Sequence, residues 1–87
     1  MSTVWIPSLM RDLTGGQARV SVPGKTVGDV IAALDAVCPG IKDRLCKGDR
    51  LDPAITVSVD GRVTQLGLLE PVGEQSEVIF LPAVAGG

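Results

Sequence analysis

Hydrophobic residues alternate with polar ones in two segments near the start of the chain. Residues 3–7 (TVWIP) place Val4 and Ile6 on one face and Thr3 and Trp5 on the other. This period of two predicts a half-buried strand. Residues 18–22 (ARVSV) alternate in the same way, with Val20 and Val22 facing inward. We expect an antiparallel hairpin, joined by a turn at residues 11–17 (RDLTGGQ) in which glycines take positive φ.

The period changes to 3.6 after residue 25, which predicts a helix. Thr26 can cap its N-terminus, and Asp29 three positions later completes a pattern that resembles a capping box. Pro39 and Gly40 end the helix. Its apolar stripe comprises Val27, Val30, Ile31, Leu34 and Cys38. Ile41 and Leu45 are expected to pack in a short turn that follows.

Strand patterns return in the second half of the chain. Residues 54–65 (AITVSVDGRVTQ) predict a hairpin, because the pair Asp60-Gly61 suits a tight primed turn between alternating residues. Residues 76–82 (SEVIFLP) predict the last strand, with Val78 and Phe80 in the core. The leucines between these segments are expected to extend the core, with a partner-binding patch as the alternative; they are Leu66, Leu68 and Leu69.

The order of these elements predicts the fold class. A hairpin, a crossover helix and a second group of strands can form one mixed sheet if the first and last strands pair in its centre. The sequence therefore predicts an α+β, β-grasp (ubiquitin-like) domain with one main helix packed on one face of the sheet. A chain of 87 residues makes one domain. We assign residues 1–82 to it and residues 83–87 to a flexible C-terminal Gly-Gly tail.

Composition excludes several classes of function. The net charge is −2, and basic residues are interleaved with acids, so no positive stripe is available for nucleic acid. No apolar run is long enough to span a membrane. The first residues lack the pattern of a signal peptide, so the expected compartment is cytoplasmic. There Cys38 and Cys46 are expected to be free thiols, with Cys46 exposed in a polar loop. Histidine is absent, and no metal site is expected.

Two features of the sequence bear on partners, one near its end and one on the outer face of the predicted sheet. The last eighteen residues contain Glu70, Glu74, Glu77 and the terminal carboxylate but no Lys or Arg, so that end is expected to favour a basic partner surface. Trp5 and Ile79 alternate out of phase with the core residues beside them. They are candidate partner-binding residues on the outer face of the sheet. The alternative for Trp5 is packing against a neighbouring loop.

Three stretches resemble the ubiquitin-like sulfur carriers, a family that includes MoaD, ThiS and CysO. They are IPSLMRDLTGGQ near the start, TVGDVIAAL in the helix and VIFLPAVAGG at the end. MoaD proteins typically finish with a Pro-Pro-Val-Ala-Gly-Gly-like tail, whereas Leu81-Pro82-Ala83-Val84 stands here. That difference makes the chain more similar to the CysO type. The resemblance covers essentially the whole chain.

The resemblance implies a protein cosubstrate rather than an enzyme, with no bound cofactor. A MoeB/ThiF-like adenylating enzyme would use ATP to activate the carboxylate of Gly87, and a sulfur source or sulfurtransferase would convert it to a thiocarboxylate. A CysO-type role implies sulfur transfer to a pyridoxal-phosphate cysteine synthase-like enzyme and release by a zinc-dependent metalloprotease. Synthases of molybdopterin, thiamin or sulfur-containing secondary metabolites are alternative acceptors.

The residue types at the end of the chain suit this chemistry. Gly86 and Gly87 lack Cβ, so the backbone can closely approach a phosphate or a cofactor. Pro82 fixes one φ at the root of the tail, which lowers the entropy lost on ordering it. Ala83, Val84 and Ala85 offer small apolar contacts to an extended groove. Residues 82–87 are therefore candidate contacts for partners, and Gly87 is the reactive residue.

A second interpretation is a ubiquitin-like protein modifier or interaction module. A modifier would form isopeptide bonds between Gly87 and lysines of other proteins. An interaction module would bind through its folded body without using the tail. The sequence leaves both alternatives open.

Overall fold

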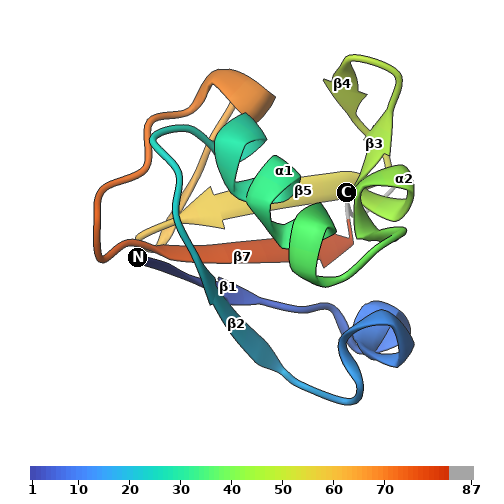
Figure 1. Cartoon of the computed structure of the whole chain (residues 1–87). Coiled ribbons are helices and arrows are strands. Elements are labelled where there is room, and N and C mark those ends of the chain that lie inside the picture. The colour runs from blue at the N-terminus through green and yellow to red at the C-terminus, as the bar shows by residue number, and fades with distance from the viewer. Residues whose placement is uncertain (83–87) are drawn as a thin grey trace.

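A computed structural model describes residues 1–82 of the chain, with side chains through Leu81 (Figure 1). A five-stranded sheet has the order β2-β1-β7-β5-β6, and a two-stranded hairpin, β3-β4, lies beside it. The strands are β1 (Ser2–Trp5), β2 (Arg19–Val22), β3 (Cys46–Lys47), β4 (Arg50–Leu51), β5 (Ile55–Val59), β6 (Arg62–Val63) and β7 (Glu77–Pro82). The α-helices are α1 (Val27–Val37) and α2 (Ile41–Leu45), and the 3₁₀ helices are η1 (Ser8–Thr14) and η2 (Gly67–Leu69).

The first and last strands pair in the centre of the sheet. β1 runs parallel to β7, with Val4 opposite Val78. β2 pairs with β1 and β5 pairs with β7, both antiparallel. Helix α1 packs across one face of this sheet (Figure 1). This is the β-grasp arrangement, and it confirms the predicted α+β fold class.

Between α1 and the sheet lies a single core of aliphatic side chains and one phenylalanine. All five residues of the predicted helix stripe are buried, as are Val78 and Phe80. Thr26 caps α1 as predicted, because its Oγ1 accepts a hydrogen bond from the Asp29 amide at 3.2 Å. The Asp29 carboxylate accepts from the Lys25 amide instead of the Thr26 amide. The cap therefore extends one residue further upstream than the expected box.

None of the helices within residues 1–82 is both long and apolar enough to cross a membrane.

The connection from β1 to β2 is more structured than predicted. Instead of a plain turn, residues 8–14 form η1, which begins after Pro7 and ends at Gly15 with a φ of 66°. Gly16 also has positive φ, at 89°, as expected. Met10 and Leu13 pack against the core from this helix. Their burial explains why the segment winds into a helix, whereas the glycines alone predicted only a reversal.

The region between α1 and β5 contains a second small hairpin that the sequence pattern did not predict. Ile41 and Leu45 are fully buried in α2, as predicted. The β3-β4 hairpin follows at once, and Cys46 pairs with Leu51 across it. Cys46 is therefore buried, and the expectation of an exposed loop cysteine was wrong. Only two residue pairs form this ladder, too few to leave an alternating pattern in the sequence.

A carboxylate connects the β5-β6 turn to the start of β7. Asp60 and Gly61 have φ values of 53° and 83°, which matches the predicted primed turn. The Asp60 carboxylate accepts hydrogen bonds from the Glu77 amide at 2.9 Å and from Ser76 Oγ at 2.7 Å. These bonds stabilise the ionised form and lower the pKa of Asp60 below its ordinary value of 3.8. The charge of Asp60 thus contributes to the position of β7.

We expect Asp60→Asn to make the free energy of unfolding of the domain less dependent on pH in the acidic range. A lowered folded-state pKa gives stability that is present above pH 3.8 and is lost as pH falls through the folded-state value. Asn tolerates the positive φ of this turn, so the backbone is retained. In urea unfolding, the variant should be less stable than the parent at pH 7, and the difference should shrink towards pH 3. Asp49→Asn, at an exposed site in the β3-β4 turn, is the control. An equal deficit at both pH values would show that the charge of Asp60 has no role.

Candidate functional site

The predicted reactive residue and most of its tail lie outside the described residues. Gly87, Gly86, Ala85, Val84 and Ala83 follow Pro82, the last residue described. The backbone of Pro82 ends β7 and pairs with Ile55 of β5. β7 begins on the side of the molecule where the N-terminus lies and runs along the sheet to the opposite side (Figure 1). In the sequence, the predicted tail thus follows directly on a central strand.

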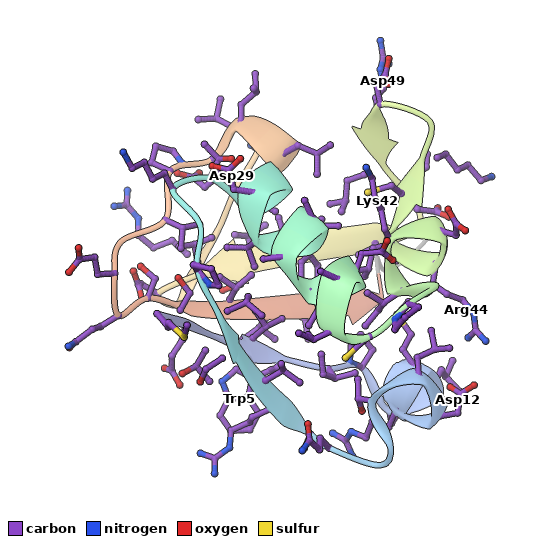
Figure 2. All side chains as sticks on the ribbon, viewed as in Figure 1. Trp5, Asp12, Asp29, Lys42, Arg44 and Asp49 are labelled. Carbon is purple, nitrogen blue, oxygen red and sulfur yellow. The ribbon has the colours of Figure 1, made fainter. Side chains whose placement is uncertain are left out.

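The two predicted docking residues lie side by side on the outer face of the sheet. Trp5 of β1 is opposite Ile79 of β7 in the parallel register. The same row continues to Arg19 on one side and to Ser58 and Val63 on the other. Trp5 projects away from α1 (Figure 2). The parallel pairing of β1 with β7 therefore brings together residues that are 74 positions apart in the sequence.

Trp5 is held on this face by its strand neighbours. Its Nε1 donates a hydrogen bond to Glu77 Oε1 at 3.2 Å. The guanidinium of Arg19 lies 5.3 Å from the centre of the ring, a distance typical of a cation–π contact. The ring remains half-exposed. A large apolar side chain fixed in one orientation loses little entropy on binding, which suits an interface anchor.

A shallow hollow of about 540 Å³ adjoins Trp5 and reaches the root of the tail. Its lining is mainly apolar and comprises Trp5, Ile6, Pro7, Ser8, Leu9, Arg11, Ile79, Phe80 and Leu81. Leu9 is 85% exposed and Leu81 is 43% exposed. Leu9 was not among the predicted contacts, because the predicted strand ended at Pro7 and the predicted turn began at Arg11, which left residues 8–10 without an element. Leu9 stands between Ser8 and Met10, which gives no periodic pattern that would mark it as a contact.

The acidic residues near the end of the sequence do not surround the root of the tail. Glu77 begins β7, and Glu74 lines a separate hollow with Met1 and Lys25. A strand of six residues spans roughly 17 Å from its first to its last Cα. The glutamates therefore lie at the opposite end of β7 from Pro82. These glutamates therefore do not place negative charge at Pro82 itself, and the expected basic partner of the last eighteen residues stays a prediction, because the terminal carboxylate lies outside the described residues.

The three leucines after β6 divide between core and surface. Leu68 packs against the core, as predicted. Leu66 and Leu69 are 58% and 77% exposed, so the expectation that they extend the core was wrong. A 3₁₀ helix of three residues can turn only one of its side chains towards α1. Sequence spacing alone did not reveal which one.

Both cysteines are buried free thiols. Burial raises the pKa of Cys46, outweighing the opposite effect of nearby Lys42. A thiol kept protonated in this way is a poor nucleophile. Within residues 1–82 no group of three or more His, Cys, Asp or Glu side chains is arranged to hold a metal ion.

Comparison with known proteins gives consistent matches over the full length. The model of the ThiS family matches residues 4–87. The sulfur carrier protein CysO of Mycobacterium tuberculosis is 38% identical over 90 residues, covering 98% of this chain and 97% of that protein. A crystal structure of the Amycolatopsis orientalis BexX/CysO complex contains a chain with a TM-score of 0.92 and 37% identity, and the match covers all of both chains. The small archaeal modifier protein 1 from Methanosarcina acetivorans gives a TM-score of 0.77 at 26% identity, covering 99% of this chain and 95% of that one.

We expect Leu81→Lys and Phe80→Lys to differ sharply in their effect on folding. Leu81 is on the outer face, where a lysine can keep its ammonium in water, so the free energy of unfolding should change by less than about 1 kcal/mol. Phe80 is 2% exposed, and a lysine there should cost at least about 3 kcal/mol. Urea unfolding monitored by circular dichroism measures both. Equal losses would mean that the outer face is covered in the free chain.

Proposed function

This chain belongs to the ThiS family, and on that premise we propose that it is a sulfur carrier of the CysO type. Its Gly87 carboxylate would be converted to a thiocarboxylate and would donate sulfur in biosynthesis. One observation carries the proposal: the family match extends through residue 87 and so includes the Gly-Gly end. A relative named as a sulfur carrier covers nearly all of the chain.

The first chemical step activates the carboxylate. A carboxylate resists nucleophiles because it is negatively charged and would have to expel oxide. In the adenylating enzyme, an oxygen of the Gly87 carboxylate attacks the α-phosphorus of ATP, and pyrophosphate leaves. The product is an acyl adenylate, in which the carbonyl carbon is electrophilic and AMP is the leaving group. ATP is bound by the partner, and this chain contributes only the carboxylate.

The second step replaces oxygen by sulfur. If a sulfurtransferase supplies the sulfur as a persulfide, a thiol must reduce that persulfide to release hydrosulfide, and the thiol leaves as a disulfide. Hydrosulfide attacks the Gly87 carbonyl carbon. The bond to AMP breaks, AMP departs with its electron pair, and one proton is released. The product is a thiocarboxylate that is ionised at neutral pH and is thus a ready nucleophile, as a low-pKa thiolate is. The carrier needs no histidine or other base to activate it, in keeping with a sequence that has none.

The composition of the tail fits a group that must enter the active sites of different enzymes. Residues 83–87 contain no side chain larger than that of Val84. Five residues reach at most ~17 Å when extended. The folded body must therefore dock near the partner's active site for Gly87 to arrive there. Trp5 and Ile79, which lie beside the root of the tail, are the proposed contacts of the body.

The proposed partners are a MoeB/ThiF-like adenylating enzyme, a sulfur source or sulfurtransferase, and a sulfur-accepting synthase. In the CysO-type role, the acceptor is a pyridoxal-phosphate enzyme that presents an activated serine, and a zinc-dependent metalloprotease releases cysteine from the tail. We propose that these reactions take place in the cytoplasm. The chain itself acts as a cosubstrate, not as a catalyst.

The direct test is sulfur transfer to the C-terminus. After incubation with a MoeB/ThiF-type enzyme, ATP and sulfide, intact-mass spectrometry should detect replacement of one oxygen by sulfur at Gly87. A variant with alanine added after Gly87 and a variant lacking Gly86-Gly87 are matched controls, and both should stay unmodified. The proposal fails if the parent remains unmodified under conditions in which a CysO control is converted.

We expect Trp5→Ala to weaken the complex with the adenylating enzyme by about thirtyfold. This corresponds to the loss of about 2 kcal/mol that is typical when a buried aromatic anchor is truncated. Val63→Ala is the control, because Val63 is 64% exposed at the far edge of the same row. Isothermal titration calorimetry gives both affinities, and circular dichroism checks that each variant is folded. Equal affinities for the two variants would exclude Trp5 as an anchor.

A protein modifier is a second candidate function. The similarity to a small archaeal modifier protein supports this second candidate function. A modifier would form isopeptide bonds from Gly87, and denaturing gels of cell extract probed for this chain would then show ladders of conjugates. Sulfur transfer without conjugates would favour the carrier alone.

A further inference from the structure

We propose that the hollow beside Trp5 receives an acidic, apolar segment of the partner: one apolar side chain flanked by carboxylates. This inference rests on the proposed function, because it specifies the chemistry of the surface that guides the carboxylate of Gly87 to its enzymes. The occupant is defined by two properties of the hollow, its apolar lining and the arginines around it.

The apolar lining calls for an apolar side chain. Leu9 and Leu81 are both well exposed here, and Ile79 lies between Leu81 and Trp5 in the same hollow. Three chain segments supply this surface, from β1, η1 and β7. Covering it would remove apolar area from water, which is the main favourable term in protein association.

Three arginines lie around the hollow. Arg11 lines it directly, and its Nε donates a hydrogen bond to the Ile6 carbonyl at 3.3 Å, which fixes its position. Arg19 is exposed and lies over the Trp5 ring. Arg44 reaches across from α2 and donates to the Leu9 carbonyl at 3.4 Å. Guanidinium groups held in place on an apolar surface are well suited to bind carboxylates in bidentate fashion.

Of the acids on this side, Asp12 is paired with a cation, whereas Glu77 is bound only by the neutral Trp5 indole. Asp12 forms an ion pair with Arg44 at 3.5 Å, and the two side chains appear together in Figure 2. Glu77 accepts the hydrogen bond from Trp5. Within residues 1–82 that ion pair is the only one formed, so Arg11 and Arg19 have no carboxylate partner there. Glu77 keeps its negative charge, but Arg11 and Arg19 outnumber it, so a net positive charge beside the hollow is available to a partner. The chain as a whole is nevertheless acidic.

The position of the hollow links docking to delivery. Leu81 lines it and directly precedes Pro82, so a partner segment seated there lies next to the point where the tail leaves the body. A segment with basic residues would meet Arg11 and Arg19 with like charge. A second copy of this chain would bring the same arginines face to face. Both occupants are disfavoured by the same charges that favour an acidic one.

A pair of synthetic peptides tests this chemistry without any enzyme. One has a central leucine flanked by glutamates, and the other has the glutamates replaced by lysines. In a titration of ¹⁵N-labelled protein, the acidic peptide should shift the resonances of Trp5 Nε1, Leu9 and Leu81 and should bind at least tenfold more tightly. Equal binding, tighter binding of the lysine peptide or no binding of either at millimolar concentration would overturn the proposal. So would self-association through these same residues, measured by sedimentation.

Charge reversal identifies the arginines responsible. The double variant R11E/R19E should lose at least tenfold in affinity for the acidic peptide, since two exposed ion pairs are replaced by repulsion. R11Q/R19Q removes the positive charges without reversing them and should give an intermediate loss. R50E, on the distant β3-β4 hairpin, is the matched control and should bind as the parent does. An unchanged affinity of R11E/R19E, with its fold verified by circular dichroism, would overturn the proposal.

A final measurement separates this inference from the proposed function. With the adenylating enzyme, R11E/R19E should slow formation of the thiocarboxylate at low carrier concentration, and added salt should slow the parent more than the variant. If the parent never forms a thiocarboxylate, the proposed function fails, while the peptide titration still decides the chemistry of the hollow. If the parent and the variant react equally and with the same salt dependence, the inference fails and the function stands.

Discussion

The parallel pairing of β1 with β7 is the interaction on which the rest of the structure depends. It brings the two ends of the domain into the centre of one sheet, so both strands have hydrogen-bonded neighbours on each side. Val4 and Val78 meet in this register and are completely buried beneath α1. A pairing between residues so far apart in the chain has a high cost in loop-closure entropy. The continuous aliphatic core that it closes offsets that cost.

The same pairing produces a functional surface on the opposite face. Because side chains alternate along a strand, a register that buries Val4 and Val78 must turn Trp5 and Ile79 outward together. η1 then adds Leu9 and Arg11 at the end of the sheet where β7 terminates. A central strand is among the least mobile elements of a small domain. The tail therefore starts from a fixed point, next to a face that can bind a partner.

In the described residues, the core and the outer face of the sheet have different roles. The core holds no reactive group: its two cysteines are buried, and Asp60 acts through hydrogen bonds to the start of β7. The outer face has a fixed aromatic ring, exposed leucines and arginines held by backbone carbonyls. In the proposed function, recognition belongs to this face, whereas the chemistry belongs to the last carbonyl of the chain.

The sequence by itself determined the strands of the five-stranded sheet, the main helix, its cap at Thr26 and the turn at Asp60, because each depends on local periodicity or on the backbone preferences of single residues. It also determined the Gly-Gly end and the family. The extent of η1, the β3-β4 hairpin, the burial of Cys46 and the exposure of Leu66 and Leu69 were decided only by the tertiary structure. These segments are too short to carry a period, and their side chains take positions set by α1 and the sheet. The charge around the root of the tail was likewise invisible in the sequence. Glu77 begins β7 at the far end of that strand, and its carboxylate reaches only as far as Trp5. Arg11 comes from η1 and lines the hollow that Leu81 shares.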